Sequence, residues 1–189
     1  MKFYTIVLYV IVLFGLQGCV SGTSSYYVLS VPSTPKTHYA MSKNIIAVEK
    51  VTVPGYLYKR DIAIATSPSQ IKLLGNAQWG EDLDSGLTNR LISYLQKKFN
   101  HPDVYLYPWG IDKQPDVKVS VQITRFIAQA DTVYLDATWS VEDMKQHRRI
   151  SRLFSTHVAT TSNIDTIVSS MDKAFARLEE TIANGVKHF

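Results

Sequence analysis

The pattern that most constrains the fold is a strict alternation of apolar and polar side chains over residues 117–124, repeated over residues 133–141. A period of two predicts strands with one face on a core and one face in water. After Arg125 the alternation slips, which predicts a bulge or bend. Residues 150–159 return as a third strand after a turn at residues 145–149, so we expect an antiparallel meander.

Two segments instead repeat their apolar side chains with helical spacing, at residues 81–99 and 163–187. The first carries acidic residues in its opening turn and Lys97 and Lys98 in its last turn, as the helix dipole favours. Asn100 and Pro102 follow it as stop signals, and Ser162 or Asn163 can cap the second. We therefore expect two amphipathic helices.

Shorter strands are expected at residues 26–31, 44–53, 62–66, 70–74 and 104–107, the third and fourth joined by a turn at Ser67, Pro68 and Ser69. Strands with one dry face and helices with one apolar stripe pack as two layers. The sequence therefore predicts a single α+β domain over residues 26–189, with a mainly antiparallel sheet packed by both helices. No linker divides it.

The N-terminus carries the pattern of an exported chain. Lys2 precedes an apolar run over residues 3–16, too short for the roughly 20 residues of a spanning helix. The run leads into Leu16-Gln17-Gly18-Cys19, and Cys19 is the only cysteine of the chain. This arrangement predicts a lipoprotein signal peptide at residues 1–18, a lipidated tether at residues 19–25, and diacylglycerol and an N-acyl (palmitate) chain on Cys19. A plain secretory signal and an uncleaved anchor are the alternatives.

The chain lacks the common catalytic sequence motifs. It contains no nucleophile elbow, no His-Glu-x-x-His motif and no glycine-rich phosphate loop. Its five histidines are scattered, none at metal-ligand spacing from another ligand. A net charge of +4 is too weak to indicate a nucleic-acid partner. We therefore expect neither an enzyme nor a metal site, and no cofactor beyond the acyl groups.

Two charged clusters have plain structural interpretations. Glu81, Asp82 and Asp84 stand where the first helix is expected to begin, so dipole matching is favoured over a general acid and base pair or a cation site. A basic group occupies the turn and the strand after it, and a solvated turn is favoured there over contact with head groups or an acidic partner. Its members are His147, Arg148, Arg149 and Arg152.

Aromatic residues at turns indicate a contact surface. Tyr56, Leu57 and Tyr58 follow Pro54-Gly55, away from any periodic core face, and such exposed apolar area marks an interface. Trp79 and Trp109, both next to a glycine, are candidates for the same role. The tryptophans can equally fold back as lids on the core. These five residues are the predicted partner-binding set.

The order of motifs resembles one known family over nearly the whole chain. The matching segments are Cys19, Tyr26-Tyr27-Val28-Leu29, Val48-x-x-Val51-x-Val53-Pro54-Gly55-Tyr56-Leu57, Trp79-x-Glu81-x-Leu83, Pro108-Trp109, Val117-x-Val119-x-Val121-x-Ile123-x-Arg125-Phe126 and Leu135-x-Ala137-x-Trp139. In this order they resemble the ABC-type transport auxiliary lipoproteins. Ile127 departs from the pattern, which has an acidic residue after the Arg-Phe pair.

The resemblance implies a non-enzymatic lipoprotein on the periplasmic face of the outer membrane, within a lipid transport system that supports membrane integrity. Members of the family accompany MCE-domain proteins, whose tunnels span the periplasm. The lipoprotein is expected to dock the far end of the tunnel, as a homo-oligomeric ring. Val20 follows the cysteine, in place of the aspartate that retains lipoproteins at the inner membrane. This agrees with an outer-membrane location.

Two other functions fit parts of the sequence. A structural or assembly lipoprotein of another envelope machine needs the same anchor and domain, and only the collinear motifs separate it from the transport role. A periplasmic hydrolase would need Asp82 or Asp84 beside His101. Those residues are expected at opposite ends of one helix, about 28 Å apart at 1.5 Å per residue.

Overall fold

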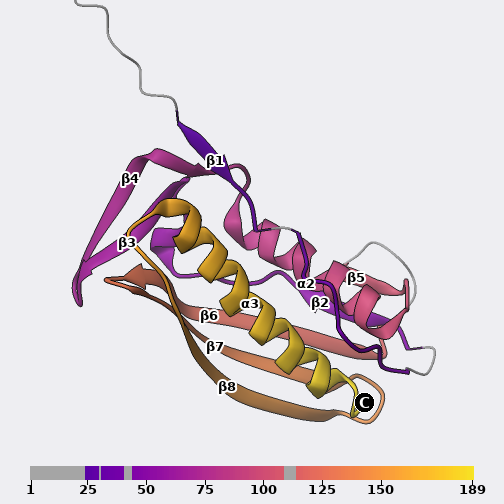
Figure 1. Ribbon diagram of the computed structural model, residues 1–189. Helices are drawn as coiled ribbons and strands as arrows, with labels where there is room; N and C mark the ends of the chain where they lie inside the picture. The colour runs from indigo at the N-terminus through magenta and orange to yellow at the C-terminus, as the bar shows by residue number, and fades with distance from the viewer. Residues whose placement is uncertain (1–23, 30, 41–43, 109–113) are drawn as a thin grey trace, which may run out of the picture.

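A mixed eight-stranded sheet carries two helices that lie side by side on one of its faces (Figure 1). The computed structural model describes residues 24–29, 31–40, 44–108 and 114–189. In chain order the elements are β1 (Ser25–Tyr27), β2 (Ile46–Glu49), the 3₁₀ turn η1 (Gly55–Tyr58), β3 (Asp61–Ser67), β4 (Gln70–Trp79), α2 (Leu83–Phe99), β5 (Val104–Tyr107), β6 (Val117–Gln129), β7 (Thr132–Asp143), β8 (Arg148–Ala159) and α3 (Ile164–Val186). The predicted α+β class is confirmed.

The predicted meander is strands β6, β7 and β8, paired antiparallel in that order. The alternating side chains of β6 and β7 send Val119, Ile123, Leu135 and Val141 into the core beneath the helices. The predicted irregularity is a register shift between Ile123 and Arg125. It moves Phe126 onto the core face and leaves Arg125 and Ile127 on the face away from the helices.

Both helices follow the predicted stripes. Asn163 caps α3 by accepting hydrogen bonds from the backbone N–H groups of Asp165 and Thr166. Asn100 ends α2 in the left-handed conformation at φ 47°. The predicted start of α2 at residue 81 is two residues early, because Asp82 has extended backbone angles and stands at the cap.

Parallel strand pairs complete the sheet, and the sequence did not reveal them. β2 pairs in parallel with both β5 and β6, β3 pairs in parallel with β6, and β1 pairs in parallel with β4. Such pairs join segments far apart in the chain, so no local turn marks them. The strand expected at residues 44–53 pairs only over Ile46–Glu49, and Thr52 then makes an isolated bridge to Gln122.

Ion pairs with buried cations hold the two helices together. Arg90 of α2 is wholly buried and contacts Glu179 and Asp172 of α3. Lys98, 1% exposed, contacts Glu180 at 2.9 Å. A buried charge is costly without a partner, so these pairs fix how α2 lies against α3.

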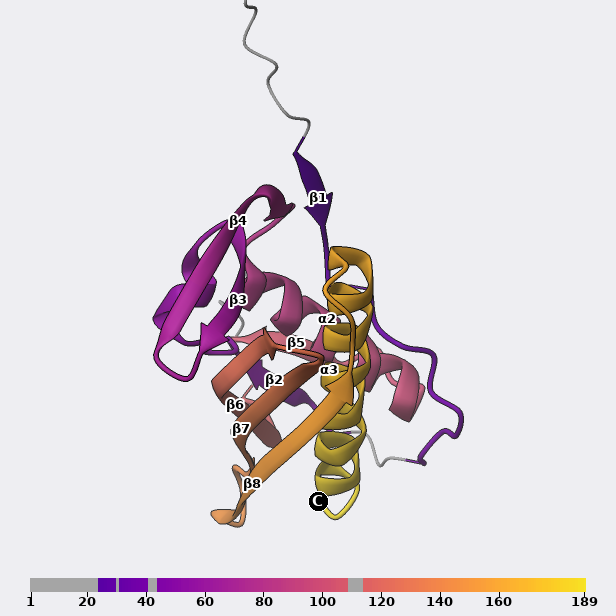
Figure 2. The ribbon, with the colours of Figure 1, turned by 60° about the vertical axis from the view of Figure 1, so that its left-hand side comes forward.

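Residues 31–40, here called the strap, run along the helices after β1 (Figure 2). The Tyr39 N–H donates to the Lys98 carbonyl at 2.8 Å, and the Tyr39 hydroxyl lies 2.6 Å from Asn184 Oδ1. Lys98 Nζ donates to Thr37 Oγ1 at 3.0 Å. The strap is therefore fastened to both helices by polar contacts.

Candidate partner-docking site

Strand β6 changes its neighbour halfway along, and the sheet forks there. Its first residues pair with β2 at Val117 and Val119, and its last pair with β3 at Ala128 and Gln129. Between them η1 enters the gap, and the Tyr56 hydroxyl accepts a hydrogen bond from the Phe126 N–H at 3.1 Å. Tyr56 thus supplies the acceptor that a neighbouring strand would otherwise provide.

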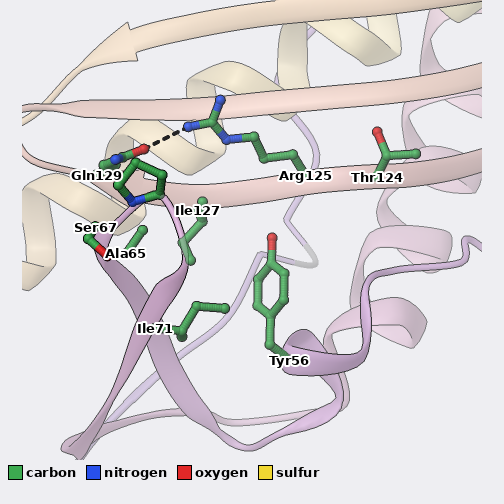
Figure 3. A pocket seen from close by; sticks show the side chains of 9 residues that line it. Tyr56, Ala65, Ser67, Ile71, Thr124, Arg125, Ile127 and Gln129 are labelled. Atoms are coloured by element: carbon green, nitrogen blue, oxygen red, sulfur yellow. Dashed lines mark hydrogen bonds between the residues drawn. The ribbon is translucent and has the colours of Figure 1, made fainter.

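A pocket of about 390 Å³, here called the fork pocket, opens at this gap. Figure 3 shows Tyr56 rising from η1, Ile71 and Ala65 on the β3–β4 hairpin, and Arg125 and Ile127 on β6. Its remaining lining residues are Ser67, Pro68, Thr124 and Gln129. The hairpin thus contributes an apolar side formed by Ala65, Pro68 and Ile71, and the polar side chains of Thr124, Arg125 and Gln129 lie along β6.

Arg125 gives the pocket a positive charge. Its guanidinium lies 3.9 Å from the centroid of the Tyr134 ring and donates to Gln129 Oε1 at 2.9 Å. Among the described residues no carboxylate forms an ion pair with it, and Asp136, opposite in register, instead accepts a hydrogen bond from Ser155 at 2.5 Å. The charge of Arg125 thus remains available to an anion.

The fork pocket has the chemistry of a binding site. Burial raises the pKa of Tyr56, so its hydroxyl stays protonated and holds the β6 backbone. Among the described residues that line it, there is no carboxylate, histidine or cysteine that could act as a general base or activated nucleophile. Aliphatic walls beside an unpaired guanidinium suit an aliphatic side chain next to a carboxylate.

The structure separates the predicted aromatic set. Leu57 and Trp79 are 3% and 2% exposed, so the expectation that Leu57 is exposed is wrong, and Trp79 packs as part of the core. η1 turns Leu57 inward, and β4 continues to Trp79, beyond its predicted end at residue 74. Tyr58 is 58% exposed and Tyr56 lines the fork pocket. Trp109 lies outside the described residues, as do Cys19 and the signal peptide. Partner contact by these residues stays a prediction.

The residues considered for hydrolysis do not come together. Asp84 forms an ion pair with Lys50 at 2.7 Å at the start of α2. The His101 ring contacts the Asn44 carbonyl at 3.0 Å beyond the end of the same helix. In the part of the chain that the structure describes, no three potential metal ligands cluster.

The basic turn lies at the end of the domain that carries the C-terminus, far from β1 (Figures 1 and 2). Arg148 donates to the His188 carbonyl at 2.7 Å and stacks on Phe189 at 4.4 Å. Arg149 donates to Ser140 at 3.1 Å. Two of its arginines thus tie the turn to the domain itself.

Sequence reasoning missed Arg125 and Ile71 as site residues. Arg125 entered only as a family motif residue, and Ile71 only as part of a short strand. The collinear motifs around Tyr56 and Arg125 were the available signal, because the Tyr56 hydroxyl meets the N–H of Phe126, the neighbour of Arg125, across 70 positions of sequence.

Among the described residues, no helix combines the length and apolar character needed to cross a bilayer. Membrane attachment by the acyl groups on Cys19 stays a prediction.

Comparison with known proteins identifies similarity to one group over most of the chain. The family model described as "ABC-type transport auxiliary lipoprotein component" matches residues 27–183. The intermembrane transport lipoprotein PqiC of Escherichia coli (strain K12) is 28% identical over 181 residues, covering 91% of this chain and 92% of that protein. PqiC of Shigella flexneri matches with the same identity and coverage.

Solved structures share the fold. A crystal structure described only as that of an uncharacterized protein is 25% identical, with a TM-score of 0.72, and covers 87% of this chain and 99% of its own. A protein from Xanthomonas campestris is 12% identical with a TM-score of 0.74, covering 87% of this chain and 97% of its own.

Proposed function

Because this chain belongs to the family of ABC-type transport auxiliary lipoprotein components, we propose that it is a non-enzymatic outer-membrane lipoprotein of an MCE-type lipid transport system. Acyl chains on Cys19 hold it on the periplasmic face of the membrane, where it docks the end of a periplasm-spanning MCE-domain protein. The family match over residues 27–183 carries this proposal. The similarity to an intermembrane transport lipoprotein supports it.

The fork pocket is the proposed docking site. Its occupant is a segment of the MCE-domain protein that presents an aliphatic side chain next to a carboxylate. The aliphatic part packs against Ile71 and Ile127, and the carboxylate pairs with Arg125. Ile71 is 43% exposed in the free chain, so covering it removes apolar surface from water.

A homo-oligomeric ring is part of the proposal. Strand β8 pairs only with β7 among the described strands, and its Leu153 is 87% exposed. Arg149 and Arg152 on the same strand oppose pairing of β8 with a second β8. A closed ring instead joins two different surfaces of neighbouring copies, so β8 would meet another part of the next subunit.

Site-specific crosslinking in intact cells tests the docking. A photoreactive residue at position 71 of the full-length chain should yield an adduct containing the MCE-domain protein, identified by mass spectrometry. Position 72 is the matched control, because neighbouring strand residues point to opposite faces. Arg125→Glu should abolish the adduct from position 71 while the protein stays folded.

Two results would reject this proposal. One is an adduct of equal yield from positions 71 and 72. The other is an adduct from position 71 that contains a different envelope machine, which would favour the role of a structural or assembly lipoprotein.

A further inference from the structure

The strap does not lie flat on the helices. Between it and the exposed sides of α2 and α3 runs a groove of about 670 Å³, here called the strap groove. The strap contributes Ser33, Thr34, Pro35, Lys36 and Thr37, and the helices contribute Tyr94, Lys98, Lys173, Ala176, Arg177 and Glu180. None of these residues lines the fork pocket, so the two sites are separate.

Positive charge dominates the lining of the strap groove. Lys36 and Lys173 are exposed, and neither forms an ion pair with any described carboxylate. Arg177 donates to Thr156 Oγ1 at 2.8 Å and to the His157 carbonyl at 2.9 Å, both uncharged groups. Three cations thus border the groove without a carboxylate partner.

The carboxylates nearby are already engaged. Glu180 accepts hydrogen bonds from Lys98 at 2.9 Å, from Tyr39 at 3.1 Å and from Tyr94. Asp172 accepts from Arg90 at 2.5 Å. These contacts leave neither carboxylate to neutralise the three cations.

The base of the groove is apolar. Tyr94 and Pro35 are buried, and Ala176 is half-buried beside them. A volume of about 670 Å³ lies within the usual range of roughly 300–1,000 Å³ for small-molecule sites. Cations around an apolar base fit a ligand with an anionic head and an apolar body.

We propose that the strap groove binds the phosphate group of a glycerophospholipid, with Lys36, Lys173 and Arg177 facing the phosphate. Basic pockets recognise phospholipid head groups through such charge-assisted hydrogen bonds. The lipid's glycerol and upper acyl carbons lie against Pro35, Ala176 and the Tyr94 ring. Free phosphate offers the same anion but leaves this apolar surface uncovered, so the lipid is the favoured source.

The lipid site is separate from the proposed docking role. A domain anchored at a bilayer would meet phospholipid at high local concentration. The test is calorimetric titration of the full-length acylated protein in nonionic detergent. The ligands are dihexanoyl phosphatidylglycerol, inorganic phosphate, and dihexanoylglycerol, which lacks the phosphate.

We expect the phospholipid to bind and the other two to bind at least about tenfold more weakly. Lys36→Gln combined with Lys173→Gln should weaken phospholipid binding about tenfold or more, and the corresponding arginine pair should retain it. Lys59→Gln combined with Lys72→Gln removes the same two charges from exposed positions outside the groove, so this control pair should bind as the wild type does. Circular dichroism of each variant verifies folding.

Three outcomes would overturn the lipid site: no binding of the phospholipid, unchanged binding by the glutamine pair, or equal binding of inorganic phosphate. Crosslinking from position 71 in the glutamine pair separates this proposal from the docking role. Loss of lipid binding with the adduct retained supports two independent sites. A chain with the native groove that binds the phospholipid but gives no adduct from position 71 would count only against docking.

Discussion

The guanidinium of Arg90 and the carboxylate of Glu179 form a two-pronged ion pair across the α2–α3 interface, at 3.0 Å and 3.2 Å, and neither side chain is exposed. Burial lowers the pKa of Arg90, but Glu179 and Asp172 outweigh it and raise that pKa. Burial raises the pKa of Glu179 to about 7 from 4.5, against the opposing effect of Arg90. Above about pH 7 Glu179 is ionised and the ion pair with Arg90 is complete. Between pH 4.5 and about 7 the folded chain holds a proton on Glu179 that the unfolded chain has lost, so the stability from this group falls as pH rises through this range.

Removing one partner of this pair should be far worse than removing both. Glu179→Ala leaves the Arg90 charge buried without its main partner and should lower the free energy of unfolding by about 3–5 kcal/mol. The double variant Arg90→Met, Glu179→Leu should lower it by less than the single variant does. Urea unfolding of all three proteins measures the difference, and a double variant less stable than Glu179→Ala would contradict the expectation.

A methyl group at position 185 should destabilise the protein. A Cβ on Gly185 would lie 2.5 Å from the Trp139 ring, where α3 crosses β7. Gly185→Ala should therefore cost about 1–3 kcal/mol by overpacking, more than the gain of up to ~1 kcal/mol in helix propensity. Gly75→Ala is the control, because a Cβ there meets nothing within 4 Å. Thermal unfolding compares them, and equal melting temperatures would show that α3 can shift freely.

Acid should weaken the contact between the helices through Glu180. Burial acts to raise the pKa of Glu180, but hydrogen bonds from Tyr94, Lys98 and Tyr39 outweigh it and hold that pKa below 4.5. A lowered pKa means that this stabilisation is present above pH 4.5 and is lost as pH falls through the folded value. Glu180→Gln should therefore be less stable than the wild type at pH 6, with the gap narrowing towards pH 3. Urea unfolding across this range measures the gap, and a constant gap would contradict the linkage.

The Tyr56 hydroxyl should stabilise the fork of the sheet. Tyr56→Phe leaves the Phe126 N–H without its acceptor and should cost about 1–3 kcal/mol. Tyr58→Phe removes the same atom from a side chain that is 58% exposed and should change stability little. Thermal unfolding distinguishes them. Equal effects of the two changes would mean that water satisfies the Phe126 N–H.

Cys19 should determine where the protein resides. Cys19→Ser removes the thiol that is expected to carry diacylglycerol, so the variant should leave the membrane fraction. Mass spectrometry of the wild-type product should show a chain that begins at Cys19 and carries acyl groups. An unmodified wild-type chain with another N-terminus would remove the basis for membrane attachment.

Elements governed by local periodicity were readable from the sequence. The stripe on α3, the alternation in β6 and β7, and the slip after Arg125 all reflect which face meets the core, and each appears where it was expected. The parallel pairing of β2 with β6 was not readable, since the two strands lie about 70 positions apart with no shared turn.

Burial of polar and aromatic side chains was also not readable. Arg90 and Lys98 are charged side chains of the kind usually found on the solvent-exposed face of a helix. In the folded chain, however, α3 and the strap cover them. Leu57 was expected to be exposed because it lies on a turn away from any periodic core face, but η1 turns it into the core. The fork pocket needs η1, the β3–β4 hairpin and β6 together, so only tertiary structure could assemble it.

The pairing of β1 with β4 determines how the domain responds to a pulling force on its N-terminus. Three residue pairs and the bond from the Gly80 N–H to the Tyr27 carbonyl would bear the load first, followed by the Arg90 contact with the Leu29 carbonyl. Detachment of residues 24–40 would lengthen the extended N-terminal tether by about 50 Å. The helices and β2–β8 would keep their own contacts. Single-molecule pulling should therefore record a short, low-force extension before the domain unfolds. Its absence would mean that residues 24–40 detach only when the rest of the domain unfolds.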